Sequence, residues 1–156
     1  MKIIQIKKVD GDDEVEAVRK LFYVYANYLK LDLDLNGLDS DFENLPGEYS
    51  PPNGCLFLAT YNHNPAGCVG LRKHNDCGCE IKRLFVLPKY RGLGIGRSLA
   101  KKMIEIARKA GYKRIQLDTI SSLIEAISLY LSLGFVITTP DLQDSSINVI
   151  YMELSL

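Results

Sequence analysis

The sequence lacks the features that mark membrane and secreted proteins. It has no uninterrupted apolar run of about 18 residues, the length that a membrane span requires. Charged side chains follow the first residue too closely for a secretory signal peptide, so we expect a cytoplasmic protein without a membrane partner. The four cysteines are too few and too scattered for a disulfide framework, and reduced thiols agree with that location.

The chain also has no formal net charge. The 19 lysines and arginines balance 19 aspartates and glutamates, which argues against a surface devoted wholly to nucleic acid. The balance hides an uneven distribution, because residues 82–114 contain eleven basic and one acidic side chain, whereas residues 10–50 contain three basic and eleven acidic ones. We therefore expect two opposed electrostatic fields and no nucleic-acid partner.

What the chain has is the length and composition of one globular domain. Its 156 residues, 47% of them hydrophobic, contain no repeat, linker or low-complexity tract, so we expect a single domain over residues 1–156. Apolar runs bounded by turn residues predict strands, and apolar spacings of three and four predict helices. The expected strands are residues 2–9, 55–61, 68–72, 79–87, 114–119, 135–138 and 147–154. The expected helices are residues 10–30, a short one near 39–44, one that Gly111 ends, and residues 122–134 behind a capping box of Ser122 and Glu125.

The segment with the clearest chemistry is the glycine-rich turn after the strand at residues 79–87. Gly92, Gly94 and Gly96 let the backbone approach a ligand closely and turn successive N–H groups toward it, which forms an anion-binding nest at a helix N-terminus. Arg91 and Arg97 add positive charge on either side. This pattern predicts a phosphate or pyrophosphate ligand, although a glycine-rich helix entry without a ligand stays open.

Two nucleotide-binding motifs do not fit this turn. The chain has no GxxxxGK[ST] segment, so it lacks a Walker loop. The spacing here is GxGxG after an antiparallel meander in mid-chain, whereas a Rossmann turn needs GxGxxG within a parallel βαβ unit. Nucleotide hydrolysis and hydride transfer are therefore both disfavoured.

Two motifs resemble those of the GNAT acyltransferase superfamily. Residues 91–96, RGLGIG, match its coenzyme A loop, Q/R-x-x-G-x-G/A, and the VLP of residues 86–88 matches the strand end before that loop. Residues 126–135, AISLYLSLGF, match its A-x-x-L-Y-x-x-x-G-F motif at the expected separation. The element order agrees too, so the resemblance covers essentially the whole chain. It implies an α+β fold with a mixed, mostly antiparallel sheet of about seven strands flanked by about four helices.

The resemblance also implies an activity and a set of site residues. It implies an N-acetyltransferase that moves an acetyl group from acetyl-CoA, its cosubstrate, to a primary amine by direct attack in a ternary complex. Tyr130 would give a proton to the departing thiolate, and Glu80 would serve as the base that the protonated amine needs. The residues expected to bind the coenzyme or stabilise the oxyanion are Leu84, Phe85, Val86, Arg91, Gly92, Leu93, Gly94, Ile95, Gly96 and Arg97.

Several alternatives stay open at this stage. Tyr130 can be a core packing residue, and Glu80 can be an ion-paired surface acid. The chain as a whole can be an acyl-CoA-binding module without catalytic activity. Many family members have an asparagine where this chain has Leu123, which leaves the coenzyme contacts of that turn uncertain. Among the rings of residues 22–28, mostly core, one or two could line the acceptor pocket. Homodimers are common in the superfamily, and the sequence leaves open whether this chain forms one.

The remaining expectations concern metal binding and the two charged segments. His63, His74, Cys77 and Cys79 lack the spacing of a zinc site, so we expect no metal. The basic field of residues 82–114 lies where a polyanionic coenzyme A would dock. The acidic field of residues 10–50 lies where the acceptor should enter, which predicts a cationic amine.

Overall fold

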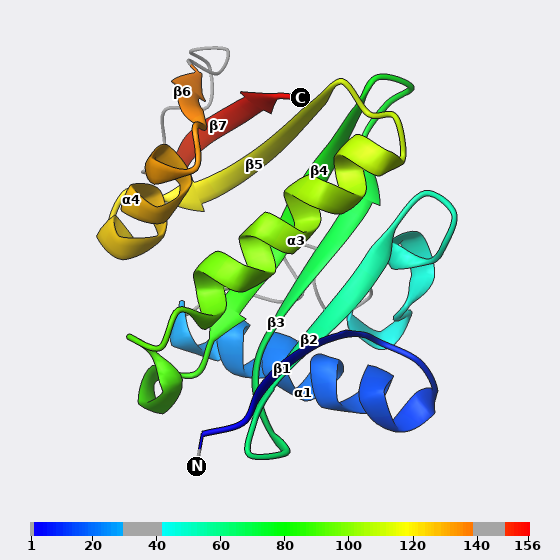
Figure 1. Ribbon diagram of the computed structural model, residues 1–156, viewed down its shortest axis with the longest axis vertical. Helices are drawn as coiled ribbons and strands as arrows, with labels where there is room; N and C mark the ends of the chain where they lie inside the picture. Colours follow the sequence, from blue (N-terminus) through cyan, green and yellow to red (C-terminus); the bar gives the residue numbers. More distant parts are fainter. Residues whose placement is uncertain (1, 30–41, 139–148) are drawn as a thin grey trace.

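The computed structural model describes residues 2–29, 42–138 and 149–156 (Figure 1). Seven strands form one sheet in the order β1-β2-β3-β4-β5-β7-β6, and every neighbouring pair is antiparallel except the parallel pair β4 and β5. The strands are β1 (Ile4–Lys8), β2 (Cys55–Tyr61), β3 (Asn64–Lys73), β4 (Gly78–Val86), β5 (Arg114–Ile120), β6 (Val136–Thr138) and β7 (Val149–Ser155). The helices are α1 (Asp12–Tyr28), α3 (Ile95–Lys109) and α4 (Ile124–Ser132), with 3-10 turns at Gly47–Tyr49 and Pro88–Tyr90. The predicted α+β fold with a mostly antiparallel mixed sheet is thus confirmed.

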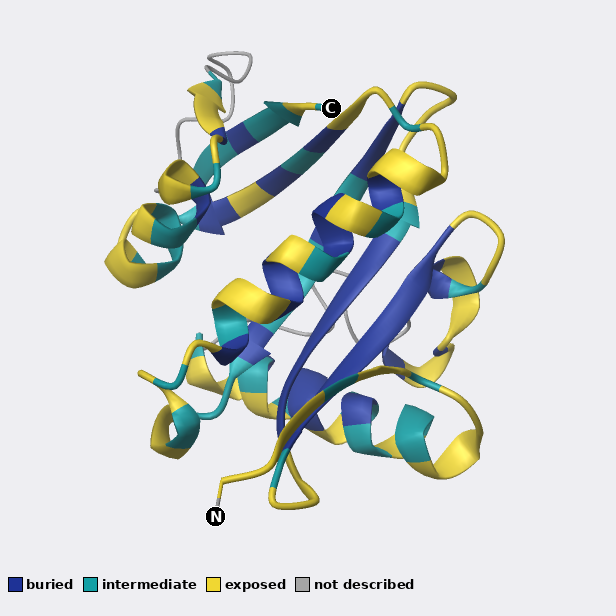
Figure 2. Ribbon diagram, in the orientation of Figure 1, coloured by how far each residue is buried: buried dark blue, intermediate teal, exposed yellow. Residues whose placement is uncertain are grey.

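Two hydrophobic clusters cover the two faces of this sheet. Alternation along β2 sends Phe57 into the cluster that contains the apolar side of α3, and sends Leu56 and Leu58 into the cluster that contains α1. Strands β2 and β3 are therefore buried over most of their length (Figure 2). The molecule is a helix–sheet–helix arrangement with β4 near its middle.

The tight connection between β2 and β3 is shorter than the sequence predicts. We expected a turn over residues 62–67, but β3 begins at Asn64 and only Asn62 and His63 form the turn, with φ of +48° and +71°. Positive φ at both central residues is the geometry of a two-residue hairpin turn, and asparagine adopts it readily.

Strands β4 and β5 separate soon after they meet. Their ladder has only three residue pairs and ends at Glu80 opposite Gln116. Beyond that pair, β4 continues beside β3 to Val86, and β5 continues beside β7 to Ile120, so the two strands diverge (Figure 1). The opening lies next to the glycine-rich turn.

A β-bulge interrupts β4 within this diverging part. Cys68 pairs with Phe85 and Gly70 with Lys82, so β4 has one residue more than β3 between these pairs. Arg83 takes a positive φ of +58° there. Because the bulge shifts the alternation, Phe85 packs in the α1 cluster although Ile81, four residues earlier, packs in the α3 cluster.

One helix prediction is wrong, and another lies partly outside the described residues. The described residues contain three α-helices; in the short helix expected near 39–44, Phe42 and Glu43 have helical backbone, and residues 39–41 lie outside the described part. The capping box of Ser122 is wrong, because α4 begins one residue beyond Leu123, which is its N-cap without a side-chain hydrogen bond.

Candidate active site

The loop between β4 and α3 has the backbone geometry of an anion-binding nest. Gly92 and Gly94 have φ of +81° and +83°, and Gly94 is the N-cap of α3. A Cβ built on either glycine meets no atom within 4 Å, so the backbone conformation rather than crowding requires glycine at both positions. No side chain caps the helix and no acidic residue lies in its first turn, so its first N–H groups are left for a ligand. This anion-binding nest suits a pyrophosphate.

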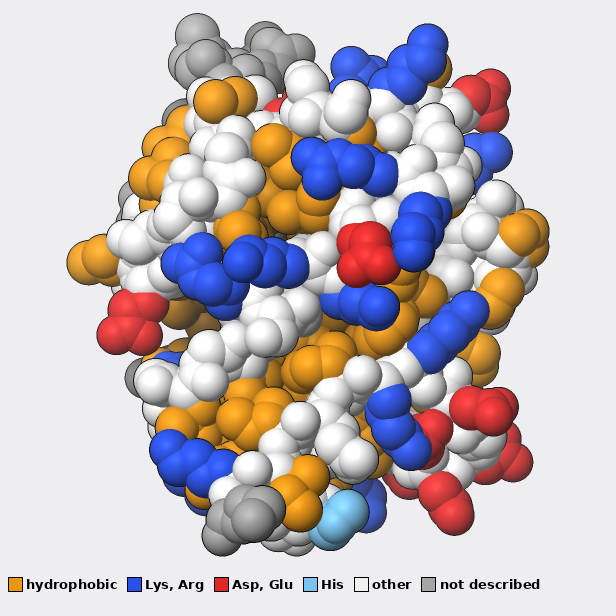
Figure 3. Space-filling model, in the orientation of Figure 1, with side chains coloured by type: hydrophobic (Ala, Val, Ile, Leu, Met, Phe, Trp, Pro, Cys, Tyr) orange, Lys and Arg blue, Asp and Glu red, His pale blue; other side chains and the backbone are white. Residues whose placement is uncertain are grey.

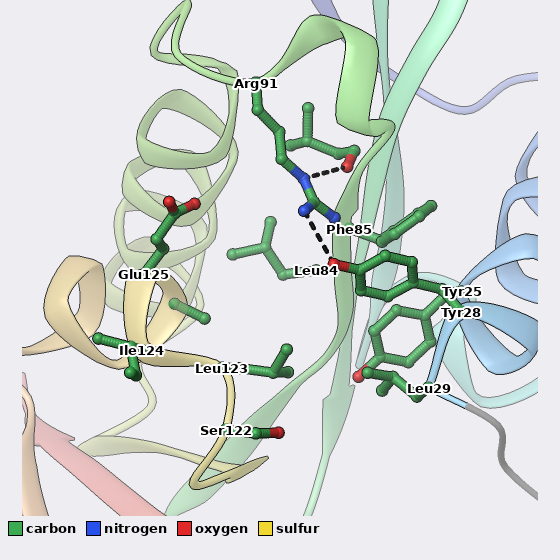
Figure 4. Close-up of a pocket in the computed structure, with 12 residues that line it drawn as sticks. Tyr25, Tyr28, Leu29, Leu84, Phe85, Arg91, Ser122, Leu123, Ile124 and Glu125 are labelled. Carbon is green, nitrogen blue, oxygen red and sulfur yellow. Dashed lines mark hydrogen bonds between the residues drawn. The ribbon is translucent and has the colours of Figure 1, made fainter.

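Two cavities meet beside this loop. The larger, of about 420 Å³, lies between the end of α1 and the start of α4, with β4 between them (Figure 4). The smaller, of about 220 Å³, lies over the loop itself and the start of α3. Both cavities share Val86, Arg91, Glu125 and Ala126. The larger is further lined by Tyr25, Tyr28, Leu29, Leu84, Phe85, Ser122, Leu123 and Ile124, and the smaller by Tyr90, Gly92, Gly94, Ile95, Gly96 and Leu129.

Arg91 stands at the junction of the two cavities. Its Nε donates to the carbonyl oxygen of Val86 at 3.0 Å, and its Nη1 donates to the hydroxyl of Tyr28 at 3.2 Å. The guanidinium carbon lies 5.0 Å from the ring centre of Tyr28 and 5.8 Å from that of Phe85. Arg91 therefore connects the glycine loop to α1 by a hydrogen bond and a cation–π contact.

Tyr130 is buried and is in the lining of neither cavity. Its side chain packs against Phe135 with ring centres 5.5 Å apart, and only 5% of the residue is exposed. Burial raises the pKa of Tyr130 well above its usual range, and the phenol of Tyr25 and the carboxylate of Asp118 raise it further. The phenol thus stays protonated at neutral pH, as a proton donor must.

Glu80 lies in the laddered part of β4, away from the larger cavity. Its Oε1 is 3.4 Å from Nε of Arg72 and 3.4 Å from Nδ1 of His74. Phe85 is five positions further along β4, which places it roughly 16 Å from Glu80 along an extended strand. It lines a separate hollow of about 90 Å³ that also contains Asp118 and Glu153. The role of Glu80 as base stays a prediction.

The structure brings together most of the predicted coenzyme residues. Leu84, Phe85 and Val86 line the larger cavity, and the three glycines and Ile95 line the smaller one. Leu93 packs against the α3 cluster, and Nη2 of Arg97 donates to Oγ of Ser132 at 3.0 Å. Those two side chains are in neither lining.

Sequence reasoning found the cavity rings but missed several residues of α4. Tyr25 and Tyr28 line the larger cavity, whereas Phe22 is fully buried, in agreement with one or two rings in a pocket. Glu125, interpreted from the sequence as part of a capping box, lines the larger cavity, as does Ser122, for which the sequence left both a cap and a polar ligand contact open. Their position after a splayed strand was the missing information, and no residue pattern signals it.

The charge segments are only partly arranged as expected. The basic side chains of α3 are spread over its exposed face, next to the glycine loop (Figure 3). The acids Asp12, Asp13 and Glu14 lie in the first turn of α1, whereas the cavity adjoins the other end, roughly 20 Å away at the rise of an α-helix. Four further acids of this segment, at positions 32, 34, 39 and 41, lie outside the described residues. The prediction of a cationic acceptor therefore gains no support from α1.

Metal-ligand groups and membrane-spanning helices are both absent from the described part of the chain. In residues 2–29, 42–138 and 149–156, no three His, Cys, Asp or Glu side chains are grouped so that they could hold a metal ion. None of the helices described here has the length and apolar character to cross a membrane.

Comparison with known proteins agrees with this geometry. Residues 17–135 match the acetyltransferase (GNAT) family, and the chain belongs to that family. An uncharacterized N-acetyltransferase of Schizosaccharomyces pombe is 35% identical over 98% of this chain and 95% of its own. The N-acetylaspartate synthetase of Rattus norvegicus is 32% identical over 74% of this chain and 39% of its own.

Solved structures give the same result. An acetyltransferase of Streptococcus agalactiae superposes with a TM-score of 0.82 at 25% identity, over 98% of both chains. A Bacillus anthracis acetyltransferase crystallised with acetyl coenzyme A superposes with a TM-score of 0.63 at 27% identity, over 70% of this chain and 67% of the other. The protein is an acyltransferase, and acetyl-CoA is its cosubstrate.

Proposed function

We propose that the protein transfers the acetyl group of acetyl-CoA to a primary amine by direct attack in a ternary complex. The observation that carries this proposal is the pair of joined cavities around Arg91. One lies over the anion-binding loop, and the other extends past the end of β4 to α1. A coenzyme held at the loop can thus extend its thioester toward a cavity with room for a second substrate.

Each part of the chain has a distinct role in this reaction. Acetyl-CoA supplies the activated acyl group. The N–H groups of Gly92–Gly96 hold its pyrophosphate, and the widened edge of β4 near Leu84–Val86 offers backbone N–H groups to the developing oxyanion. Tyr130 gives its proton to the leaving sulfur: its phenol is protonated at neutral pH, and burial raises its pKa further.

The proposal limits the acceptor to the class of amines. The relative from Rattus norvegicus is named for making N-acetylaspartate, which puts amino acids into the set of acceptors to be tested. The lining of the larger cavity combines aromatic rings with one guanidinium and one carboxylate, from Arg91 and Glu125. Such a lining fits a small polar amine.

Release of the coenzyme A thiol from acetyl-CoA tests this function. The panel should contain amino acids, peptide N-termini, polyamines and aminoglycosides, with acetyl-CoA alone as the hydrolysis control. We expect acceptor-dependent thiol release with at least one amine and the acetylated amine as product. Tight coenzyme binding by calorimetry without turnover on any amine would indicate the non-catalytic acyl-CoA-binding module instead.

A further inference from the structure

The charged side chains of the larger cavity lie where it meets the smaller one. Arg91 and Glu125 are the charged residues of its lining, and both also line the smaller cavity over the glycine loop. The described residues that line the larger cavity alone have no charged side chain, and apart from Ser122 they are aromatic or aliphatic. The part of the cavity away from the coenzyme loop is therefore mainly apolar.

Leu123 and Ile124 form the apolar wall at the start of α4. Leu123, the N-cap residue of α4, extends toward the side of the cavity that Tyr25 and Leu29 form (Figure 4). Ile124 also lines the cavity and is 71% exposed, the highest value among the large hydrophobic side chains of the described residues. Exposed apolar side chains grouped at a cavity are typical of a site that binds an apolar part of a ligand.

The opposite wall, at the end of α1, presents aromatic rings. The ring of Tyr25 packs on that of Phe85 with centres 5.5 Å apart, and burial raises the pKa of Tyr25, as expected for a phenol with little water around it. Tyr28 is 48% exposed, and its hydroxyl already accepts the hydrogen bond from Arg91. This wall thus offers ring surface to a ligand and carries no charge of its own.

We propose that the acceptor is a primary amine whose non-reacting end is an uncharged aliphatic or aromatic group, held between Leu123 and the tyrosines of α1. The proposal rests on the acyl-transfer function proposed above. The charged groups at the junction suit the polar end of the amine, and the apolar walls suit its other end. Leu123 is then a residue that determines acceptor specificity.

The cavity has the size and the chemistry to select such an amine. Its volume of about 420 Å³ lies in the range of small-molecule sites, so it has room for a thioester and a small amine together. An apolar end gains free energy when it leaves water for these walls. A carboxamide or a second ammonium group in the same place would lose its hydrogen bonds to water and find few partners in exchange.

The test compares two amines of nearly the same shape, isopentylamine and β-alaninamide, which differ in an isopropyl group against a carboxamide. Leucine and asparagine repeat this comparison with an α-carboxylate present. Thiol release from acetyl-CoA gives kcat/KM for each acceptor, expressed per unprotonated amine so that differences in amine pKa do not enter. In each pair that is acetylated, we expect the wild-type protein to prefer the isopropyl member by about 10-fold or more.

Leu123→Asn makes the same exchange of groups in the protein. Asparagine is a preferred N-cap residue, so the start of α4 should keep its fold. We expect the preference for the isopropyl member to fall about tenfold in this variant, because the apolar contact is lost. Leu131→Asn is the matched control: Leu131 lies on the same helix, is 47% exposed and is in neither lining, so the preference should stay at the wild-type value.

Two outcomes would overturn this proposal and leave the proposed function intact. One is a wild-type preference for the carboxamide members, or for polyamines, over isopentylamine and leucine. The other is a preference that Leu123→Asn leaves unchanged; if that variant instead alters the relative rates with acetyl-CoA and butyryl-CoA, the apolar wall belongs to the acyl chain of the donor.

Failure of the proposed function gives a different result. A wild-type protein that binds acetyl-CoA by calorimetry and acetylates no amine would remove the acyl-transfer function together with its acceptor. Far-ultraviolet circular dichroism identifies a folding failure of Leu123→Asn, and in that case Ile124→Asn, with its exposed side chain on the same wall, takes its place with the same expected result.

Discussion

The two ends of β4 show how one strand can be structural at its start and functional at its end. At the start, Gly78–Glu80 are bonded to β5 on one side, and the register with β3 covers Cys79 and Glu80 on the other. There Glu80 is enclosed by Arg72 and His74. At the end, the β5 ladder is absent, Arg83 forms a bulge, and Arg91 extends into two cavities. Complete hydrogen bonding excludes a ligand, whereas an interrupted ladder leaves backbone groups to bind one.

Tyr130 gives the largest expected effect at the functional end. Tyr130→Phe keeps the ring beside Phe135 but removes the proton donor, so we expect kcat to fall by about 100-fold or more while KM for acetyl-CoA changes little. Because burial raises the pKa of Tyr130, it should cause no descending limb in the wild-type rate profile below about pH 10. Steady-state kinetics across pH measures both. A raised KM with an unchanged kcat would make Tyr130 a binding residue only.

Gly94 offers the next largest effect, together with a matched control. Gly94→Ala forces a side chain into a left-handed conformation at a cost of about 1–2 kcal/mol and should weaken acetyl-CoA binding about tenfold. Gly111 has a similar φ of +87° and also open space around a built Cβ, but it lies beyond the other end of α3. Gly111→Ala should therefore lose similar stability in urea unfolding and keep the calorimetric affinity. Equal loss of affinity in both variants would contradict a ligand-binding role for the nest.

Arg91 should give a smaller effect. Arg91→Lys keeps the positive charge but loses the planar group that contacts Val86, Tyr28 and Phe85. We expect KM for acetyl-CoA to rise several-fold, on the order of 1 kcal/mol, with kcat within a factor of two or so. Arg108→Lys, on the last turn of α3 and away from both cavities, is the control in the same kinetic assay. An equal change in both variants would show that only the overall charge matters.

Glu80 gives the smallest expected effect if the two ends of β4 differ as described. Glu80→Gln removes one charge from an ion-paired group, so the free energy of unfolding should fall by about 1 kcal/mol or less. Activity at pH 7 should remain close to wild type. Urea unfolding and the thiol-release assay measure the two quantities. A flattened pH profile would restore Glu80 as the base that the family resemblance implies.

Much of the fold could be predicted from the residue pattern. The strand at residues 55–61 has the predicted bounds because turn residues flank a continuous apolar run. The hairpin turn after it was predicted too long, since Asn64 and Pro65 pair with β2 despite their turn propensity. Local preference is overridden there by a two-residue turn that already reverses the chain.

Of the candidate site, the glycine loop and the strand end at Leu84–Val86 could be predicted from the sequence motifs, and both line the cavities. The bulge depends on a positive φ at Arg83, a conformation that no arginine signals in a sequence. The larger cavity depends on the divergence of β4 and β5 beyond Glu80 and Gln116, and that divergence is a tertiary property.

The short ladder between β4 and β5 also has a consequence for folding cooperativity. A seam of three residue pairs joins a four-stranded sheet, β1–β4, to a three-stranded one, β5–β7. Sheets joined so sparsely can open as separate units at less than the global unfolding free energy. Amide hydrogens of β5 and β7 should then exchange faster than those of β2 and β3, and acetyl-CoA, by bridging the seam, should slow them.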